Sequence, residues 1–333
     1  MTRIACLTPA GQGALATLGL HGPGAWEAAR ALFRPRSGAT LPDVPERGRF
    51  WLGRAGEGVA DEVVLAVKQT EPVWLELHCH GGREVVRFLL ELFAARGLSV
   101  CTWQEFLRHT APDPLRAAAA IALASATTAR AAAVLLDQQQ GALGQSLDAA
   151  LAALDRGEDT AVREMLAALE RRSGLGLHLT APWRVTVAGA PNVGKSSLVN
   201  ALAGYQRSVV AATPGTTRDV VTTQLALDGW PVELADTAGL RDAAGAVEGQ
   251  GIRQAREAAR TADLCLWVLD ASAEPVWPDA GPVRLVVNKV DLPPAWEVAR
   301  AEGALRVSAR TGEGIAELCA AVARWLVPDP PPP

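Results

Sequence analysis

Continuous apolar runs alternate with segments of helical periodicity over residues 181–328. Strands that are covered on both faces have continuous rather than alternating apolar residues, and strands separated by helices typically form a parallel sheet. The pattern therefore predicts an α/β domain with a buried parallel sheet. Its expected strands are residues 184–188, 232–235, 264–269, 283–287 and 305–307.

Residues 1–115 have a different pattern, in which shorter apolar runs are separated by turn residues. A helical pattern over residues 83–96 follows the pair Gly81-Gly82. Short apolar runs bounded by turn signals indicate strands, so we expect an N-terminal α+β domain. Its expected strands are residues 4–7, 16–20, 62–67 and 73–78.

Residues 116–180 separate these two domains and are rich in Ala, Leu and Gln. Few helix breakers interrupt them, which predicts a short helical domain of two or three helices packed as a hairpin or small bundle. We expect joints between these helices at Gly141, Gly144 and Gly157. The Pro-rich residues 329–333 are expected to form a disordered tail.

Composition narrows the class of protein further. The net charge of −4 argues against broad nucleic-acid binding, which requires a basic surface. The five cysteines are scattered and form no CxxC pair, which indicates reduced thiols in a cytoplasmic protein. The Ala-rich residues 117–136 contain Arg130, whose charge opposes a membrane span, and residues 1–20 lack the pattern of a secretory signal.

Residues 189–196 match the pattern GxxxxGK[ST] between an expected strand and an expected helix. In such a loop, small residues let backbone N–H groups surround phosphates, and the helix N-terminus adds partial positive charge. We expect Lys195 to reach the β- and γ-phosphates as a catalytic residue, and the hydroxyl of Ser196 to bind Mg²⁺. The predicted nucleotide-binding residues here are Asn192, Val193, Gly194, Lys195, Ser196 and Ser197.

A second motif, Asp-Thr-Ala-Gly, begins at Asp236, directly after the apolar run 232–235. Asp236 is placed to hold the magnesium ion through water, and the N–H of Gly239 to sense the γ-phosphate. Between this motif and the phosphate loop, residues 214–219 are polar and contain a glycine. Their position favours a nucleotide-sensing switch segment over an ordinary turn.

The third and fourth motifs concern the base. Residues 288–291 read Asn-Lys-Val-Asp, a pattern similar to the guanine-reading motif NKxD, and residues 308–310 resemble the loop that backs the base. Asp291 would accept two hydrogen bonds that adenine cannot donate, which discriminates by about 10⁴-fold. Four motifs in order, each after an expected strand, predict GTP binding and hydrolysis. The predicted base-side residues are Asn288, Lys289, Asp291, Ser308, Ala309 and Arg310.

These residues resemble the tRNA-modification GTPases called MnmE or TrmE. The resemblance rests on APNVGKSSLVNALAG, PGTTRDV, DTAGLRDAAGAVEGQGI, VNKVDL and SARTGEGI, which occur in the family's order. Near the start of the chain, IACLTPAGQGALATLGLHGPGA and LELHCHGG are similar to the family's folate-binding domain. The resemblance implies a P-loop GTPase domain (the G domain), an N-terminal α+β domain and a helical domain.

The resemblance also implies site residues that spacing alone does not define. GTP hydrolysis would be stimulated by K⁺, with Asn192 as a ligand and the carbonyls near Ala211 and Thr213 as its partners. Glu248 would orient the attacking water, and Thr217 would be the second Mg²⁺ ligand. From the residues alone, Glu248 is equally compatible with a solvated carboxylate at a helix start.

The implied partners are GTP and GDP, a second copy of the chain, a partner protein that binds FAD, tRNA, and a folate-derived one-carbon donor. Residues 68–74 and 107–115 differ from family segments that help bind the folate. The family's second helical segment and Cys-x-Gly-Lys tail would follow the G domain, where these 333 residues stop. An alternative hypothesis is a regulatory GTPase that switches a partner, ribosome or RNA assembly contact without modification chemistry.

Overall fold

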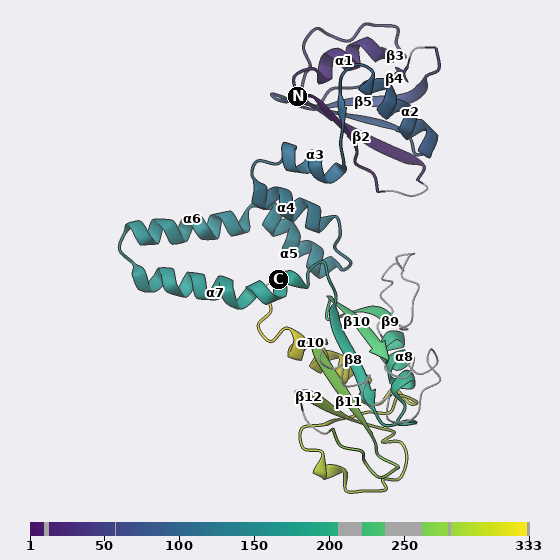
Figure 1. The fold of residues 1–333 in the computed structure, drawn as a ribbon, viewed down its shortest axis with the longest axis vertical. Helices are drawn as coiled ribbons and strands as arrows, with labels where there is room; N and C mark the ends of the chain where they lie inside the picture. The colour runs from purple at the N-terminus through teal and green to yellow at the C-terminus, as the bar shows by residue number, and fades with distance from the viewer. Residues whose placement is uncertain (10–12, 57, 206–221, 237–261, 279–280, 332–333) are drawn as a thin grey trace. The chain divides into compact units, whose positions relative to one another are not determined.

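The computed structural model describes residues 1–9, 13–56, 58–205, 222–236, 262–278 and 281–331 (Figure 1). The chain divides into two compact units, Met1–Ile121 and Ala122–Pro333. The finer division into domains at residues 115 and 180 stays a prediction. Among the described residues, none of the helices is both long enough and apolar enough to cross a bilayer.

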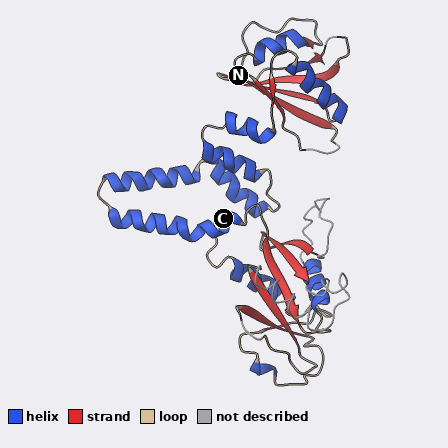
Figure 2. Cartoon of the chain, viewed as in Figure 1, coloured by secondary structure: helices blue, strands red, loops and turns tan. Residues whose placement is uncertain are grey.

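The first unit is built on a seven-stranded sheet with the order β3-β4-β5-β6-β2-β1-β7. Figure 2 draws the strands in red and the helices in blue. Its pairs are antiparallel except for β1 and β7, which are parallel. The four predicted strands are present, with ends that differ by up to three residues, whereas β3, β4 and β7 were not predicted. The strands are β1 Arg3–Cys6, β2 Leu15–His21, β3 Phe33–Pro35, β4 Phe50–Ala55, β5 Asp61–Thr70, β6 Val73–His80 and β7 Ser99–Val100.

One face of this sheet holds the core of the first unit. Alternate residues of β2, β5 and β6 point into it, as the period of a strand requires, and Leu18, Leu65 and Leu77 are fully buried. Leu89 and Phe93 of α2 belong to the same apolar cluster. The helices are α1 Ala25–Leu32, α2 Arg83–Ala94, α3 Trp103–Thr110 and α4 Pro114–Leu123, the last of which crosses the boundary between the units.

The helices α5, α6 and α7 open the second unit. Gly141 and Gly157 lie between them with positive φ values of 104° and 76°, so these two predicted joints are confirmed. Gly144 lies inside α6, and the prediction of a joint there was wrong, because one glycine in a helix interior costs only about 1 kcal/mol. The bounds are α5 Ala129–Gln140, α6 Ala142–Asp155 and α7 Asp159–Leu177.

The sheet of the second unit has the order β13-β12-β11-β8-β10-β9. Its five predicted strands are present and mutually parallel, and β9 adds an antiparallel edge that was not predicted. A tight turn at Asp228-Gly229, with φ values of 49° and 78°, joins β9 to β10. The strands are β8 Trp183–Gly189, β9 Thr222–Leu227, β10 Trp230–Asp236, β11 Leu264–Asp270, β12 Val283–Asn288 and β13 Leu305–Arg306.

Both faces of this sheet are covered. On one face, Leu266 and Val268 join the large apolar cluster that contains residues of α8 Lys195–Tyr205 and α10 Ile315–Leu326. On the other face, Leu269 packs with Trp296 in a smaller cluster beside the 3₁₀ helix η1 Val298–Arg300. This two-sided burial explains why the parallel strands read as continuous apolar runs.

Candidate nucleotide-binding site

Polar residues stand where the parallel strands of the second unit end. Gly189, Asp236, Asp270 and Asn288 are the last residues of β8, β10, β11 and β12. Because these strands are parallel neighbours, as Figure 1 shows, their last residues lie along one edge of the sheet. Open parallel sheets bind ligands outside the carboxyl ends of their strands, so this edge is the candidate site.

The loop between β8 and α8 depends on two of its glycines. Gly189 and Gly194 have φ values of 142° and 91°, and Asn192 has a φ of 63°. A Cβ atom at Gly189 would lie 2.4 Å from the Val268 carbonyl oxygen, and one at Gly194 would lie 2.5 Å from Nδ2 of Asn288. Both positions therefore require glycine for backbone conformation and for space.

Lys195 is the first residue of α8, and its side chain is buried although it is charged. Its Nζ donates hydrogen bonds to the carbonyl oxygens of Gly189 at 3.2 Å and Ala190 at 2.8 Å. The ammonium group is thus held against the loop at the N-terminus of α8. The charge of the ammonium group and the partial positive charge of the helix N-terminus both stabilise a phosphate at such a position.

Ser196 and Asp236 approach each other from α8 and β10. The Ser196 hydroxyl donates a hydrogen bond to Oδ2 of Asp236 at 2.5 Å. A hydroxyl and a carboxylate are hard oxygen ligands of the kind that Mg²⁺ prefers. The predicted pair is therefore brought together in an arrangement that fits this ion. Ser197, also predicted, is exposed in the first turn of α8.

Asn288 connects the base side of the site to the phosphate loop. It is almost fully buried; its Nδ2 donates to the carbonyl oxygen of Val193 at 2.9 Å, and its Oδ1 accepts from the N–H of Ala309 at 3.0 Å. The side chain of Asn288 thus connects three of the four predicted motifs: the phosphate loop, the Asn-Lys-Val-Asp motif to which it belongs, and the 308–310 loop.

Asp291 is held by the loop that follows β13. The hydroxyl of Ser308, which is fully buried, donates to Oδ1 of Asp291 at 2.6 Å. Nε of Arg310 lies 3.8 Å from Oδ2 of the same carboxylate. Ser308 therefore orients the predicted base-reading group by a hydrogen bond, while the exposed Arg310 only adds positive charge nearby.

Lys289 was predicted as a site residue, but its partner Asp270 was not. Nζ of Lys289 donates to Oδ2 of Asp270 at 2.6 Å and to the carbonyl oxygen of Asn192 at 2.7 Å. Burial alone would raise the pKa of Asp270, but hydrogen bonds from Lys289 and Ser272 outweigh it and lower the pKa. The sequence did contain one indication of Asp270 as a site residue: it follows an apolar run directly, as Asp236 does.

Three predicted site residues lie outside the described residues: Thr217, Gly239 and Glu248. The same holds for Ala211 and Thr213, near which the carbonyl ligands of K⁺ were expected.

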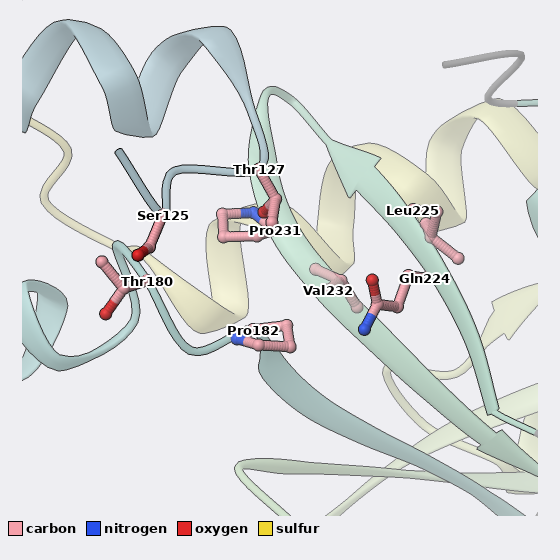
Figure 3. A pocket seen from close by; sticks show the side chains of 8 residues that line it. All are labelled: Ser125, Thr127, Thr180, Pro182, Gln224, Leu225, Pro231 and Val232. Carbon is pink, nitrogen blue, oxygen red and sulfur yellow. The ribbon is translucent and has the colours of Figure 1, made fainter. Parts of the chain in front are cut away.

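A cavity of about 250 Å³ lies at the opposite end of the same sheet (Figure 3). Pro182 precedes β8, Pro231 and Val232 begin β10, and Ser125 and Thr127 come from the segment between α4 and α5. Its lining is uncharged, and it does not include the residues of the predicted nucleotide site.

A parallel sheet whose strand ends present a GxxxxGKS loop, a magnesium-type Ser–Asp pair and an anchored NKxD motif defines a P-loop GTPase. A family model described as "50S ribosome-binding GTPase" matches residues 184–290. The G domain of FeoB from T. maritima is 24% identical, over 43% of this chain and 98% of that chain, with a TM-score of 0.32.

Relatives match nearly the whole chain. The tRNA modification GTPase MnmE of Synechococcus sp. strain RCC307 is 35% identical over 96% of this chain and 79% of its own length. The protein of the same name from a strain of Thermus thermophilus is 34% identical over 97% of this chain and 82% of its own length. The chain belongs to the MnmE family, and it binds and hydrolyses GTP. GTPases in general use Mg²⁺ in this reaction.

Proposed function

We propose that the phosphate loop of residues 189–196 binds the triphosphate of GTP and that the chain acts as a tRNA modification GTPase. The observation that carries the proposal is the convergence of Lys195, Asp236 and Asn288 on one edge of the sheet. Lys195 would contact the β- and γ-phosphates, where its charge offsets the charge that builds up during phosphoryl transfer.

The site fits Mg²⁺, which would be held by the hydroxyl of Ser196 and, through water, by Asp236. The hydrogen bond between these two groups supports this assignment, because both already face one position. The bound ion would neutralise charge on the phosphate oxygens. The resemblance to the family adds Thr217 as a further ligand, and the position of Gly239 in the Asp-Thr-Ala-Gly motif supports its N–H as the γ-phosphate sensor.

Guanine would be recognised by Asp291, with Ser308 holding its carboxylate in place and Arg310 adding positive charge nearby. The Asp291 carboxylate is only partly exposed. A carboxylate oriented to accept two hydrogen bonds is left unsatisfied by adenine, and the resulting discrimination is about 10⁴-fold. Asn288, Lys289 and Ala309 would support this pocket through the loop contacts described above.

The family resemblance further supports K⁺ stimulation through Asn192 and a water-orienting role for Glu248. Replacing K⁺ by Na⁺ should slow hydrolysis, and equal rates in the two salts would reject the cation site. Glu248→Ala should retain GTP binding but lose most turnover. Unchanged turnover in this variant would remove Glu248 from the mechanism.

The tRNA step is supported by the relatives, which are named as tRNA modification GTPases. By the same resemblance, the chain would form a homodimer and act with tRNA and a partner protein that binds FAD. In the family, a folate-derived one-carbon donor binds to the N-terminal domain, but the replacement of two of the binding segments argues against retention of this site. Residues 68–74 and 107–115 are the segments to test by substitution, because they differ from the family's.

Two measurements test the proposal. Isothermal titration with Mg²⁺ should detect binding of GTP but not of ATP, and Asp291→Asn should weaken the binding of GTP; equal affinity for ATP would overturn the site assignment. Mass spectrometry of tRNA from a deletion strain should show loss of the wobble-uridine modification. Unchanged tRNA would favour the alternative of a regulatory GTPase that switches a partner contact.

A further inference from the structure

Asp270 is a buried carboxylate that the four motifs do not account for. It is the last residue of β11 and pairs with Asn288, the last residue of β12, in the parallel register of the sheet. The next residue after Asn288 is Lys289, whose φ of 64° turns the chain at that point. The register therefore brings the carboxylate of Asp270 next to the side chain of Lys289.

Lys289 is shared between this carboxylate and the phosphate loop. Its Nζ lies 2.6 Å from Oδ2 of Asp270 and 2.7 Å from the carbonyl oxygen of Asn192. The other oxygen of the carboxylate, Oδ1, accepts hydrogen bonds from the N–H of Ser272 at 2.8 Å and from its hydroxyl at 2.7 Å. With both oxygens engaged, the carboxylate is fixed in one orientation.

The backbone around Asp270 also anchors the segment after Lys289. Nε1 of Trp296 donates to the carbonyl oxygen of Asp270 at 2.8 Å, and the N–H of Ala295 donates to the carbonyl oxygen of Ala271 at 2.8 Å. The N–H of Ala271 in turn donates to the carbonyl oxygen of Asn288 at 2.9 Å. Residues 288–296, which begin with the guanine-reading motif, are therefore held at both ends by Asp270 and Ala271.

We propose that Asp270 is a positioning residue that sets guanine-nucleotide affinity by holding Lys289 against the phosphate loop. This inference rests on the nucleotide site proposed above and adds a residue to it. A lysine side chain has four rotatable bonds and keeps much of its freedom unless a partner holds its ammonium group. A charge-assisted hydrogen bond in a largely buried setting supplies that restraint.

The consequence is an effect on binding rather than on chemistry. Asp270 touches neither the expected phosphates nor the expected attacking water, because its oxygens are occupied by Lys289 and Ser272. Loss of its charge should therefore release Lys289 and weaken the ground state and the transition state equally. Uniform weakening of this kind raises KM and Kd with little change in kcat.

The test is the affinity of the full chain for a fluorescent GDP analogue, together with kcat at saturating GTP. Asp270→Asn should raise Kd about 10-fold or more, the scale of one hydrogen bond to a charged group, and leave kcat within about twofold. Asp270→Glu, which retains the charge, should recover part of the affinity. An unchanged Kd in Asp270→Asn would overturn the proposal.

The matched control is Asp263→Asn. Asp263 immediately precedes the same strand at its opposite end, where its Oδ2 accepts a hydrogen bond from the N–H of Arg184 at 2.7 Å. Removing that charge should lower the urea midpoint of unfolding without changing Kd. An equal rise in Kd for both variants would show a general structural effect and reject a specific role for Asp270.

A double-mutant cycle with Lys289→Ala tests whether Asp270 changes the affinity for GDP through Lys289. If Asp270 acts through Lys289, the double variant should bind GDP no more weakly than Lys289→Ala alone. Additive losses would show that Asp270 acts by another route. Asp291→Asn separates the two proposals: if it weakens GTP binding while Asp270→Asn does not, only the present inference fails, whereas no effect of Asp291→Asn means that the site itself is wrong.

Discussion

Nδ2 of Asn288 lies 2.9 Å from the carbonyl oxygen of Val193, so a single buried side chain ties the end of β12 to the phosphate loop. Asn288→Ala would leave this carbonyl and the N–H of Ala309 without their partner. We expect a loss of about 2–3 kcal/mol of unfolding free energy, since each hydrogen bond contributes about 1 kcal/mol and unpaired buried groups add to the cost.

Urea unfolding followed by tryptophan fluorescence measures this loss. Asn200→Ala is the matched control, because Asn200 is exposed on α8 and its replacement should change stability by less than about 0.5 kcal/mol. Equal unfolding midpoints for Asn288→Ala and Asn200→Ala would contradict the anchoring role.

Removal of the Lys195 ammonium group should affect turnover more than folding. The group is held by two carbonyl oxygens of the loop, and in the proposed site it stabilises the transferring phosphoryl group. Lys195→Ala should lower kcat/KM for GTP by about 10²-fold or more, the cost of removing one preorganised transition-state donor. Phosphate release under saturating Mg²⁺ measures the effect, and Lys68→Ala in the first unit serves as the control. Turnover close to wild type in Lys195→Ala would exclude this lysine from the reaction.

The Ser196–Asp236 pair should determine the requirement for magnesium. In the proposed site, Ser196→Ala would remove a direct oxygen ligand, and Asp236→Asn would weaken the hold on the ion's water shell. Each variant should need a higher Mg²⁺ concentration for half-maximal GTP hydrolysis, which a titration at fixed GTP reads out. Ser173→Ala in α7, whose hydroxyl donates to the Glu170 carbonyl oxygen, is the serine control. If the Mg²⁺ concentration for half-maximal hydrolysis is unchanged in both site variants, then Ser196 and Asp236 do not bind the ion.

Elements whose structure follows from one local rule were predicted correctly from the sequence. The central strands of the second unit were predictable because strands covered on both faces read as uninterrupted apolar runs. The edge strand β9 was missed because its first residues, Thr222–Gln224, are polar and not buried, so their pattern resembles a loop. The predicted joint at Gly144 was wrong because the residues around a glycine, and not the glycine alone, decide whether a helix ends at that position.

In the candidate site too, residues in local motifs were predictable, whereas a residue placed by the folded sheet was not. Most of the residues that we propose to contact phosphate, magnesium or base follow fixed spacings in the sequence and were predicted from those spacings. Asp270 was missed because its role depends on the register that sets it opposite Asn288, and register is a property of the folded sheet.

Buried cysteines should be unreactive in the native chain. Burial raises the pKa of Cys265 and Cys319 to about 11, and burial together with the nearby charge of Asp61 raises that of Cys79 to about 11. Because the thiolate is the reactive form, iodoacetamide at neutral pH should not label these three until urea unfolds the protein. Mass spectrometry of peptides labelled before and after unfolding measures this. Rapid native labelling of Cys265 would contradict the burial of β11.

Arg130 of α5 should stabilise the attachment of that helix to the turn between β9 and β10. Its Nη1 donates to the carbonyl oxygen of Asp228 at 2.8 Å and to Oδ2 of the same residue at 2.6 Å, and its guanidinium carbon lies 4.5 Å from the centre of the Trp230 ring. The Asp228 carboxylate is largely exposed, so the ion pair is screened by solvent, and the ring contact and the bond to the carbonyl oxygen dominate.

Arg130→Met keeps an apolar stem of similar length but removes the charge and the donors. We expect a loss of about 1–2 kcal/mol, measured by urea unfolding at two salt concentrations. Because the exposed ion pair is the minor component, high salt should reduce the difference from wild type only slightly. Arg163→Met, at an exposed position of α7, should be nearly neutral. If both variants lose equal stability, or if salt abolishes the effect of Arg130→Met, then the Trp230 contact does not hold α5 in place.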